Sequence, residues 1–229
     1  MNQLLRRSAA HAFVRSLDAP LLDDDDLHHF GRVLRLRAGE SVSVSNGEGG
    51  WRMCRFVADG GLEPDSDVFE HARVAPAVTV GFALPKGDRL EWIVQKLTEI
   101  GVDRIVVLDA ERSVVRWQAD RADRQMAKLA KVGREAAMQS RRVWLPLIDG
   151  PHSPATLNGT ATALAEPGGS VLTLATPTVL IGPEGGWSPV ELAASDQHRR
   201  LGSTILRVET AALAAAVRLS ALRDELATE

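Results

Sequence analysis

From Val78 to the C-terminal end, the sequence alternates short apolar runs with segments whose apolar residues recur at helical spacing. Val78–Leu84 is an apolar run typical of a buried strand, and Arg104–Leu108 is a second one. Between them Asp88 and Glu91 form a capping-box pattern before a helix face that gathers Leu90, Ile93, Val94, Leu97 and Ile100. Such a strand–helix–strand unit joins parallel strands through a right-handed crossover. The alternation therefore predicts an α/β fold built on a parallel sheet.

Further elements follow in the same half of the chain. The pattern predicts a long helix over Asp120–Ser140, strands over Thr162–Ala165, Val179–Ile181 and Thr204–Leu206, and a last helix over Thr210–Ala227. Ser188, Pro189 and Glu191 supply a cap, a first-turn proline and a reciprocal acid, which predicts one more helix start. We expect residues 73–229 to form one large domain.

The first 72 residues indicate a small β-rich domain. The four aspartates Asp23–Asp26 are placed to cap a short helix over Leu27–Arg35. Ser41–Ser45 alternates as a half-buried strand does, Asn46-Gly47 favours a hairpin, and Trp51–Val57 returns as a second strand. The glycine- and acid-rich stretch Asp59–Asp67 is the expected loop near the domain boundary.

Composition excludes several classes of protein. The single cysteine cannot form an internal disulfide, and no apolar run is long enough for a membrane span or a signal peptide. We therefore expect a cytoplasmic protein. A net charge of −3 argues against nonspecific coating of nucleic acid. Positive charge is nevertheless concentrated in residues 86–142, which hold 13 Lys and Arg against 9 Asp and Glu.

Two strand-to-helix junctions are the candidate ligand site. Ile181–Ser188 (IGPEGGWS) leads from a strand through three glycines into a capped helix, and Leu206–Ala212 is a second junction. Glycines let a ligand approach the backbone, and free N–H groups at a helix start can bind polar or anionic groups. Each junction also has a purely structural interpretation. The glycine segment could be a simple turn; in the second junction Thr210 could cap a helix, and Arg207 and Glu209 could form a surface ion pair on an extended segment. Neither a phosphate loop nor a dinucleotide fingerprint is present.

Cations lie near other strand and helix ends, where an arginine at a helix C-terminus is often only favourable to the helix dipole. Lys86 follows the first strand of the large domain, and Arg141 and Arg142 end the long helix. His29, Arg32 and Arg35 lie on or beside the first predicted helix, next to His28. Adjacent histidines do not share a helix face, and without a supporting cysteine or acid cluster we expect no metal site.

These motifs, taken in order, resemble those of one family. The segments HHFGRVLRLRAGESVSVSNGEG, ALPKGDRLEWIVQKLTEIGVDRIVVLDAERSVVRW, KVGREAAMQSRR, IGPEGGWSPVEL and LGSTILRVETAALAA resemble the RsmE family of bacterial 16S ribosomal RNA uridine-N3 methyltransferases, within the SPOUT superfamily. The resemblance spans nearly the whole chain. Trp187 stands where the family usually has phenylalanine, and Met138 occupies a variable slot.

The resemblance implies a fold, a cofactor and partners. It implies an N-terminal PUA-like RNA-binding β-barrel, an α/β SPOUT methyltransferase domain with a C-terminal trefoil knot, and a homodimer. The expected substrate is a specific uridine of 16S ribosomal RNA in the assembled small subunit. The implied cofactor is S-adenosyl-L-methionine, held by three loops. By the family pattern these match Leu164, Ala165 and Glu166, then Ile181, Gly182, Pro183, Glu184, Gly185 and Gly186, then Leu201, Gly202, Leu206, Arg207, Thr210 and Ala211.

The implied reaction needs a base, because uracil N3 is a weak nucleophile until its proton leaves. Glu209 and Glu184 are the candidate bases, and Arg207 or Arg141 could stabilise charge on the uracil oxygens. The expected RNA contacts are His29, Arg32, Arg35, Lys86, Arg141 and Arg142. Three alternatives stay open: a SPOUT methyltransferase that acts on a ribose 2′-O or a guanine N1, a catalytically inactive RNA-binding assembly factor, and a nucleotide-binding protein.

Overall fold

The structure, a computed structural model, describes residues 2–226. By internal packing the chain divides into two compact units, which are described separately. Unit 1 comprises Met1–Arg73 together with Arg134–Leu145, and unit 2 comprises Val74–Gly133 together with Pro146–Glu229. The sequence-based division after residue 72 did not anticipate that a second, distant segment packs with the N-terminal residues.

Unit 1 is built on a five-stranded sheet. Its path runs β1-β2-β3-β4, with β5 also paired to β3; β1 and β2 are parallel, and the pairs made by β3 are antiparallel. The elements are α1 (Gln3–Arg7), β1 (Ala10–Phe13), α2 (Asp24–His28), a π-helical turn (His29–Val33), β2 (Ser41–Ser45), β3 (Gly50–Phe56), β4 (Leu62–Pro64) and β5 (Phe69–Glu70). The predicted β2–β3 hairpin is confirmed.

Two predictions for this unit were wrong in detail. The first helix begins at Asp24, because the Asp23 carboxylate accepts a hydrogen bond from Asp26 N, and its end widens into the π-helical turn. The stretch Asp59–Asp67 is not wholly loop, since Leu62–Pro64 pairs with β3 as β4. The two glycines of this stretch lie in the turn before the strand, which itself contains Glu63.

The end of the long helix completes the core of unit 1. Ala137 and Met138 are buried with Val42, Val44 and Phe30 in one apolar cluster. Arg134 donates to the Asp26 carboxylate, which is 4% exposed, and to the carbonyl of Phe13. A buried carboxylate needs such a partner, because an unpaired buried charge is strongly destabilising.

Unit 2 contains a six-stranded sheet in the order β11-β9-β10-β6-β7-β8, and every pair in it is parallel. The strands are β6 (Thr79–Ala83), β7 (Arg104–Leu108), β8 (Leu147–His152), β9 (Thr162–Val171), β10 (Thr178–Ile181) and β11 (His198–Arg200). The helices are α3 (Leu90–Ile100), α4 (Ala119–Gln139), a short 3-10 helix (Pro154–Leu157), α5 (Pro189–Ala193) and α6 (Val208–Leu226). The predicted parallel α/β fold is confirmed.

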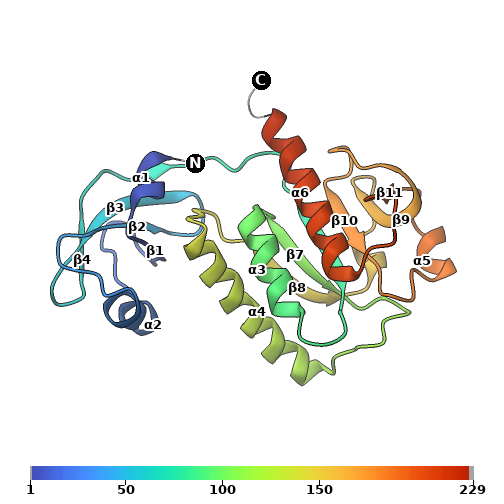
Figure 1. Cartoon of the computed structure of the whole chain (residues 1–229), viewed down its shortest axis with the longest axis horizontal. Helices are drawn as coiled ribbons and strands as arrows, with labels where there is room; N and C mark the ends of the chain where they lie inside the picture. Colours follow the sequence, from blue (N-terminus) through green and yellow to red (C-terminus); the bar gives the residue numbers. More distant parts are fainter. Residues whose placement is uncertain (1, 227–229) are drawn as a thin grey trace. The chain divides into compact units, whose positions relative to one another are not determined.

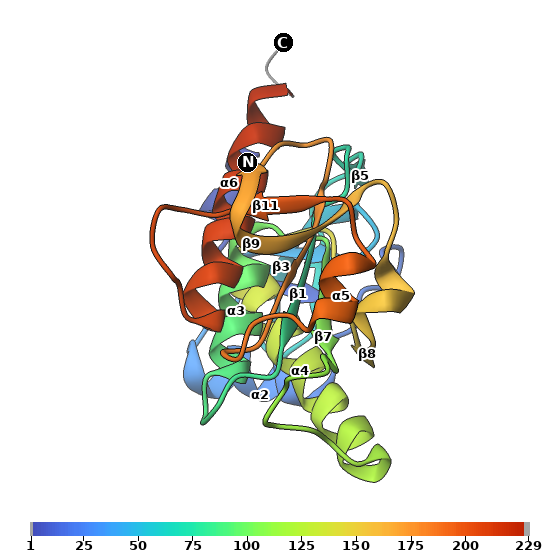
Figure 2. The same ribbon diagram turned by 90° about the vertical axis from the view of Figure 1, so that its right-hand side faces the viewer.

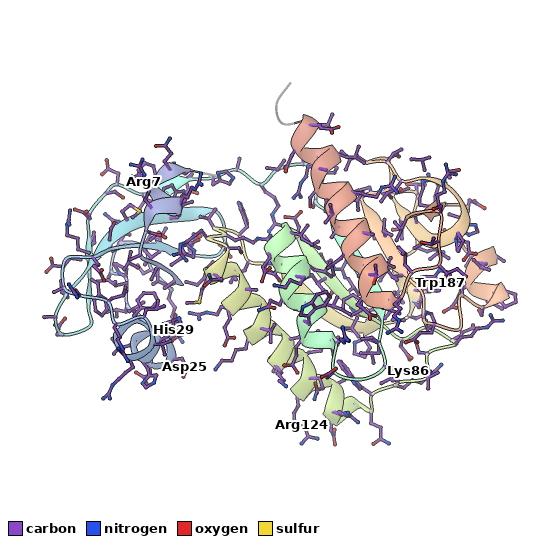
Figure 3. The ribbon with its side chains drawn as sticks, in the orientation of Figure 1. Arg7, Asp25, His29, Lys86, Arg124 and Trp187 are labelled. Atoms are coloured by element: carbon purple, nitrogen blue, oxygen red, sulfur yellow. The ribbon has the colours of Figure 1, made fainter. Side chains whose placement is uncertain are left out.

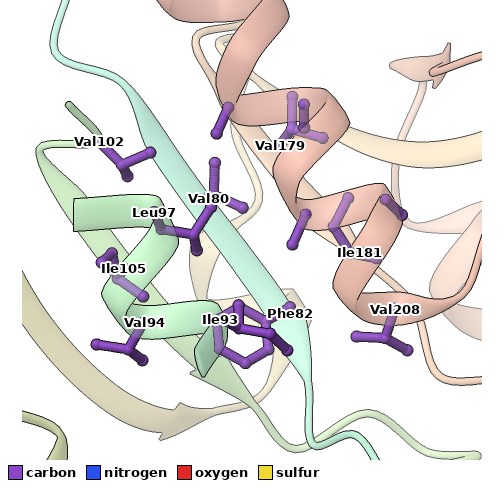
Figure 4. Packing of buried hydrophobic residues seen from close by; sticks show 14 of the residues in the cluster. Val80, Phe82, Ile93, Val94, Leu97, Val102, Ile105, Val179, Ile181 and Val208 are labelled. Atoms are coloured by element: carbon purple, nitrogen blue, oxygen red, sulfur yellow. The ribbon is translucent and has the colours of Figure 1, made fainter. Parts of the chain in front are cut away.

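Helices cover both faces of this sheet. Figure 1 shows α3 and α6 side by side, and Figure 2 shows both on one face with α5 on the other. Because side chains alternate along a strand, Phe82 packs under α3 and α6 (Figure 4), whereas the next residue, Ala83, packs with Trp187 on the α5 side. The buried alanines Ala212 and Ala216 allow α6 to lie close to the sheet.

The far end of α6 is held by a buried ion pair. Arg223 donates to the Asp103 carboxylate and to the carbonyl of Gly101, and Asp103 also accepts from Val78 N at 2.8 Å. Arg223 is 8% exposed and Asp103 is 7% exposed. Removing either charge would break this ion pair while the other charge stays buried, which is strongly destabilising.

Three predicted details in unit 2 were wrong. Asp88 does not cap α3, which begins at Leu90 after Arg89 with no side-chain cap. Thr204–Leu206 is not a strand, and the place beside β9 is taken instead by His198–Arg200. Helix α6 begins at Val208, so Thr210 lies inside its first turn and is not its cap. The predicted helix end at Ala227 lies outside the described residues.

None of the helices within residues 2–226 combines the length and the apolar character needed to cross a bilayer.

Candidate functional site

The ends of β9 and β10 bring the first two predicted cofactor loops together. The pairing of β9 with β10 ends at Leu164 and Leu180; Ala165 and Glu166 follow directly in β9, as Ile181 and Gly182 follow Leu180. The Trp187 indole Nε1 donates a hydrogen bond of 3.1 Å to the carbonyl of Ala165. The same ring packs on Gly182, where an added Cβ would lie 3.0 Å from it. Trp187 thus ties the glycine loop to β9.

The glycine loop, residues 182–186, is a tight turn in front of a capped helix. Gly186 N donates to the carbonyl of Pro183 at 2.8 Å, and Gly186 has a φ of 70°, which favours glycine. Ser188 accepts from Glu191 N at 3.1 Å while Glu191 accepts from Ser188 N at 2.8 Å, so the predicted capping box is confirmed. Glu184 and Gly185 are exposed at the tip of the turn.

The third predicted loop, Leu201 and Gly202 together with residues 206–211, approaches the same core. Leu201 and Leu206 pack against the apolar cluster that contains Ile181 and Ala211. Arg218 on α6 donates to the carbonyl of Leu201 at 3.1 Å. Sequence reasoning did not single out Arg218, because only the fold brings it to a loop 17 residues away.

The candidate catalytic residues lie at the edges of these loops. Glu184 and Arg207 are exposed, and Glu209 is half-buried in the first turn of α6. Because α6 begins at Val208, Arg207 and Glu209 do not share an extended segment as predicted. Within residues 2–226 no ion pair links Arg207, Glu209 and Glu184. Their roles stay predictions.

A fourth segment, the loop between β7 and α4, also reaches the glycine loop. Arg112 donates to the carbonyl of Gly185 at 3.2 Å, and Glu111 N donates to the Glu191 carboxylate at 2.9 Å. Sequence reasoning missed this loop as part of the site. Its position after β7, close to β10 in the sheet, is the signal that could have found it, since the carboxyl ends of parallel strands share an edge.

The predicted RNA-binding cations are distributed over both units. In unit 1, His29, Arg32 and Arg35 are exposed on α2 and the turn that follows it, and Figure 3 labels His29. A hollow of about 690 Å³ opens beside Arg32, with Leu27 among its other walls. In unit 2, Lys86 is exposed in the loop after β6 and is labelled in the same figure. Nothing in these positions tests RNA binding itself.

Arg141 and Arg142 are embedded in unit 1. The Arg141 guanidinium donates to the carbonyls of Met138, Ser8 and Ala9, and burial lowers its pKa from the ordinary value. Arg142 contributes its carbonyl, which accepts from His11 Nε2 at 2.9 Å. The Arg141 contacts hold the helix end in place, so a phosphate contact by Arg141 would compete with three existing bonds.

Within the described part of the chain, no group of three or more His, Cys, Asp or Glu side chains is arranged to hold a metal ion.

The fold and the site define a class of protein. The family of RNA methyltransferase domains matches residues 73–220, and the family of RNA methyltransferase PUA domains matches residues 22–62. The first match covers more than half of the chain. The protein is therefore an RNA methyltransferase by family, with an N-terminal PUA domain.

Individual relatives give the particular family. The ribosomal RNA small subunit methyltransferase E of Mycobacterium tuberculosis is 35% identical over 222 residues, covering 85% of this chain and 83% of the relative. The Synechocystis protein of the same name is 32% identical, covering 86% of this chain and 71% of its own length. The Neisseria gonorrhoeae structure of that name, bound to S-adenosyl methionine, has a TM-score of 0.74 at 24% identity, with 93% and 97% of the two chains covered. The chain belongs to the ribosomal RNA small subunit methyltransferase E family.

Proposed function

We propose that this protein transfers a methyl group from S-adenosyl-L-methionine to N3 of a specific uridine in 16S ribosomal RNA. The observation that carries this proposal is the meeting of these segments. Trp187 links the glycine loop to Ala165 by a hydrogen bond, and the start of α6 packs in the same apolar cluster as Ile181. Membership of the small-subunit methyltransferase E family supports the RNA substrate. The Neisseria relative with S-adenosyl methionine bound supports the cofactor.

The residues present fit that cofactor. A Cβ added at Gly186 or Gly202 would meet nothing within 4 Å, so the backbone there is open to a close ligand. The first N–H groups of α6 have no intrahelical partner and can bind a carboxylate. When bound, the cofactor supplies a methyl group on a sulfonium. The chain's part is to hold donor and acceptor in line, which can supply much of the rate.

Activation of the acceptor falls to charged groups at the loop edges. We propose Glu209 as the group that accepts the N3 proton, with Glu184 as the other candidate. We propose Arg207 as the cation that stabilises negative charge on the uracil oxygens. Glu209 is the better placed carboxylate, because the first turn of α6 holds it, whereas Glu184 is exposed at the tip of a turn.

Unit 1 would supply RNA affinity. Its exposed cations Arg32 and Arg35, with His29, form a surface suited to phosphate contacts that position RNA without reading its sequence. The further parts of this proposal are a homodimer, a trefoil knot in the C-terminal half, the assembled small subunit as substrate, and action in the cytoplasm.

Nucleoside mass spectrometry tests the proposed function. Small-subunit RNA from a strain lacking this protein should lose 3-methyluridine, and purified protein with S-adenosyl-L-methionine should restore it to isolated subunits. Loss of a different methylated nucleoside would overturn the uridine-N3 assignment. Calorimetry that detects no binding of S-adenosyl-L-methionine at millimolar concentration would overturn the enzymatic assignment.

A further inference from the structure

The loop between β7 and α4 contains two arginines with different surroundings. Arg116 is engaged inside the loop, where it donates to the carbonyls of Glu111 at 2.8 Å and Ala110 at 3.3 Å and lies 3.6 Å from the Asp109 carboxylate. Arg112 is exposed and donates one hydrogen bond, to the carbonyl of Gly185. A guanidinium has five N–H donors. Arg112 therefore holds a largely uncommitted cation against the glycine loop.

The position of Arg112 is fixed by a bridge to the glycine loop. The Glu191 carboxylate accepts from Ser188 N with one oxygen and from Glu111 N with the other. The helix start that follows the glycine loop and the backbone next to Arg112 are thus joined through one side chain. The neighbouring Ser113 hydroxyl is buried and has no hydrogen-bond partner within the described chain. The loop therefore contains a hydroxyl group that makes no hydrogen bond within residues 2–226.

Exposed cations stand at the sheet edge around Arg112, among acidic residues such as Asp88 and Glu184. The carboxyl ends of β10, β6 and β7 are neighbours, and the loops after them hold the glycine turn, Lys86 and Arg112. Both cations are exposed. An acceptor base presented at the glycine loop arrives on a polyanionic chain, whose phosphates match the planar fork of an arginine.

We propose that Arg112 binds a backbone phosphate of the substrate RNA next to the nucleotide being methylated. This inference rests on the proposed function, because it assumes that the acceptor approaches the glycine loop. RNA is favoured over the cofactor carboxylate as the anion, since the cofactor also carries an ammonium and a sulfonium that the guanidinium would repel. Arg112 acts here as an RNA-binding residue that positions the acceptor.

Arg112→Met tests the proposal, because methionine keeps an unbranched side chain and removes the charge. Binding of unmethylated small subunits is measured at several salt concentrations, with S-adenosylhomocysteine present so that no turnover is needed. Cofactor affinity is measured separately by calorimetry. We expect subunit binding to weaken about tenfold, since a charge-assisted hydrogen bond is lost. The salt dependence should lose about one ion contact, and Arg112→Lys should restore part of the affinity.

Arg124→Met is the matched control. Arg124 is also exposed in unit 2, but its guanidinium donates to the carbonyl of Asp120 on its own helix, at 3.2 Å. It should leave subunit binding within about twofold of the wild type. Equal losses of subunit affinity in the two variants would show that Arg112 acts only as part of the general surface charge, and would overturn the proposal.

Two further results would overturn it. One is unchanged subunit binding and salt dependence in Arg112→Met. The other is a loss of cofactor affinity that accounts for the whole loss of subunit binding. Failure of the proposed function would be seen separately, as absence of methyl transfer by the wild-type protein, while the binding comparison would still decide the role of Arg112.

Discussion

The Trp187 indole donates a hydrogen bond of 3.1 Å to the carbonyl of Ala165 while its ring covers Gly182. Trp187 is 3% exposed, whereas Ala165 and Gly182 are each half-buried. One side chain therefore sets the spacing between the end of β9 and the glycine loop. Two of the three proposed cofactor loops depend on it.

Trp187→Phe removes the donor and part of the ring. The half-buried carbonyl of Ala165 would lose this partner, and the loss of an ordinary hydrogen bond costs about 0.5–1.5 kcal/mol. We expect a lower free energy of unfolding by about that amount and weaker binding of S-adenosyl-L-methionine by up to about tenfold. Urea unfolding and calorimetry measure the two effects. Unchanged values of both would show that the indole N–H does not hold the loops together.

Gly182→Ala and Gly185→Ala form a matched pair of changes in the same turn. A Cβ at Gly182 would meet the indole at 3.0 Å, whereas a Cβ at Gly185 would lie at an ordinary 3.6 Å from Arg112. We expect Gly182→Ala to destabilise the protein by about 1–3 kcal/mol through displacement of Trp187. Gly185→Ala should leave the melting temperature nearly unchanged. If it still weakens cofactor binding, the backbone of this turn faces the ligand; if both variants melt alike, the packing argument fails.

His11 makes the stability of unit 1 depend on pH. Burial lowers the pKa of His11 to about 4, helped by the charges of Arg141 and Arg134 and opposed by the hydrogen bond to Arg142. Since a carbonyl only accepts, Nε2 carries the proton of the neutral ring, and Nδ1 lies 2.8 Å from the Ser43 hydroxyl.

Below an unfolded-state pKa of about 6.5, the unfolded chain binds a proton at His11 that the folded chain does not. Stability is therefore unaffected above that pH and falls as the pH drops toward 4. We expect a loss of about 2 kcal/mol by about pH 5, at about 1.4 kcal/mol for each pKa unit. His11→Gln keeps a donor and an acceptor but does not titrate. The difference in unfolding free energy between the two proteins should shrink or reverse on acidification; a constant difference from pH 7.5 to pH 5 would contradict the assignment.

Arg223→Leu should be among the most damaging single changes in unit 2. It removes the ion pair that Arg223 makes with the buried Asp103 carboxylate, at a cost of about 3–5 kcal/mol. Adding Asp103→Asn removes the charge while keeping an acceptor for Val78 N. We expect the double variant to recover part of the loss in thermal unfolding. A double variant less stable than Arg223→Leu alone would show that the carboxylate is satisfied without Arg223.

Arg32→Glu combined with Arg35→Glu tests unit 1 as the RNA-binding surface. Both side chains are exposed, so the fold should tolerate the change, although Arg35 has a φ of 55° that glutamate must also adopt. We expect weaker binding of small subunits, a shallower dependence on salt, and unchanged affinity for S-adenosyl-L-methionine. Methylation of subunits at the wild-type rate across salt concentrations would exclude this surface from RNA binding.

Sequence patterns predicted the features that depend on residues close together in the sequence. The alternation from Val78 onward gave the parallel strands, and the residues Ser188 and Glu191 carried the capping box, because each depends on neighbours in sequence. Asp88 shows the limit of this reasoning. Its spacing to Glu91 matched a cap, but its side chain is fully exposed, and the helix starts after Arg89.

Features set by distant contacts could not be predicted. Thr204–Leu206 was predicted as a strand, yet Ile205 is 90% exposed. The strand that pairs with β9 is instead the polar segment His198–Arg200, whose sequence shows no strand pattern. Arg141 was predicted as an RNA contact from its position at a helix end. Its bonds to Ser8 and Ala9, more than 130 residues away, give it a structural task that only the fold reveals.

The packing of Arg134–Leu145 with the N-terminal residues limits how this protein can be divided or recombined. A fragment ending near residue 73 would lose the partner of the buried Asp26 and the carbonyl that accepts from His11. Exchange of RNA-binding modules between relatives would therefore need three crossover points, one near residue 73, one within α4 and one near residue 145. Evolution of this half of the molecule is expected to couple substitutions in the first 30 residues to those at the end of a helix a hundred residues later.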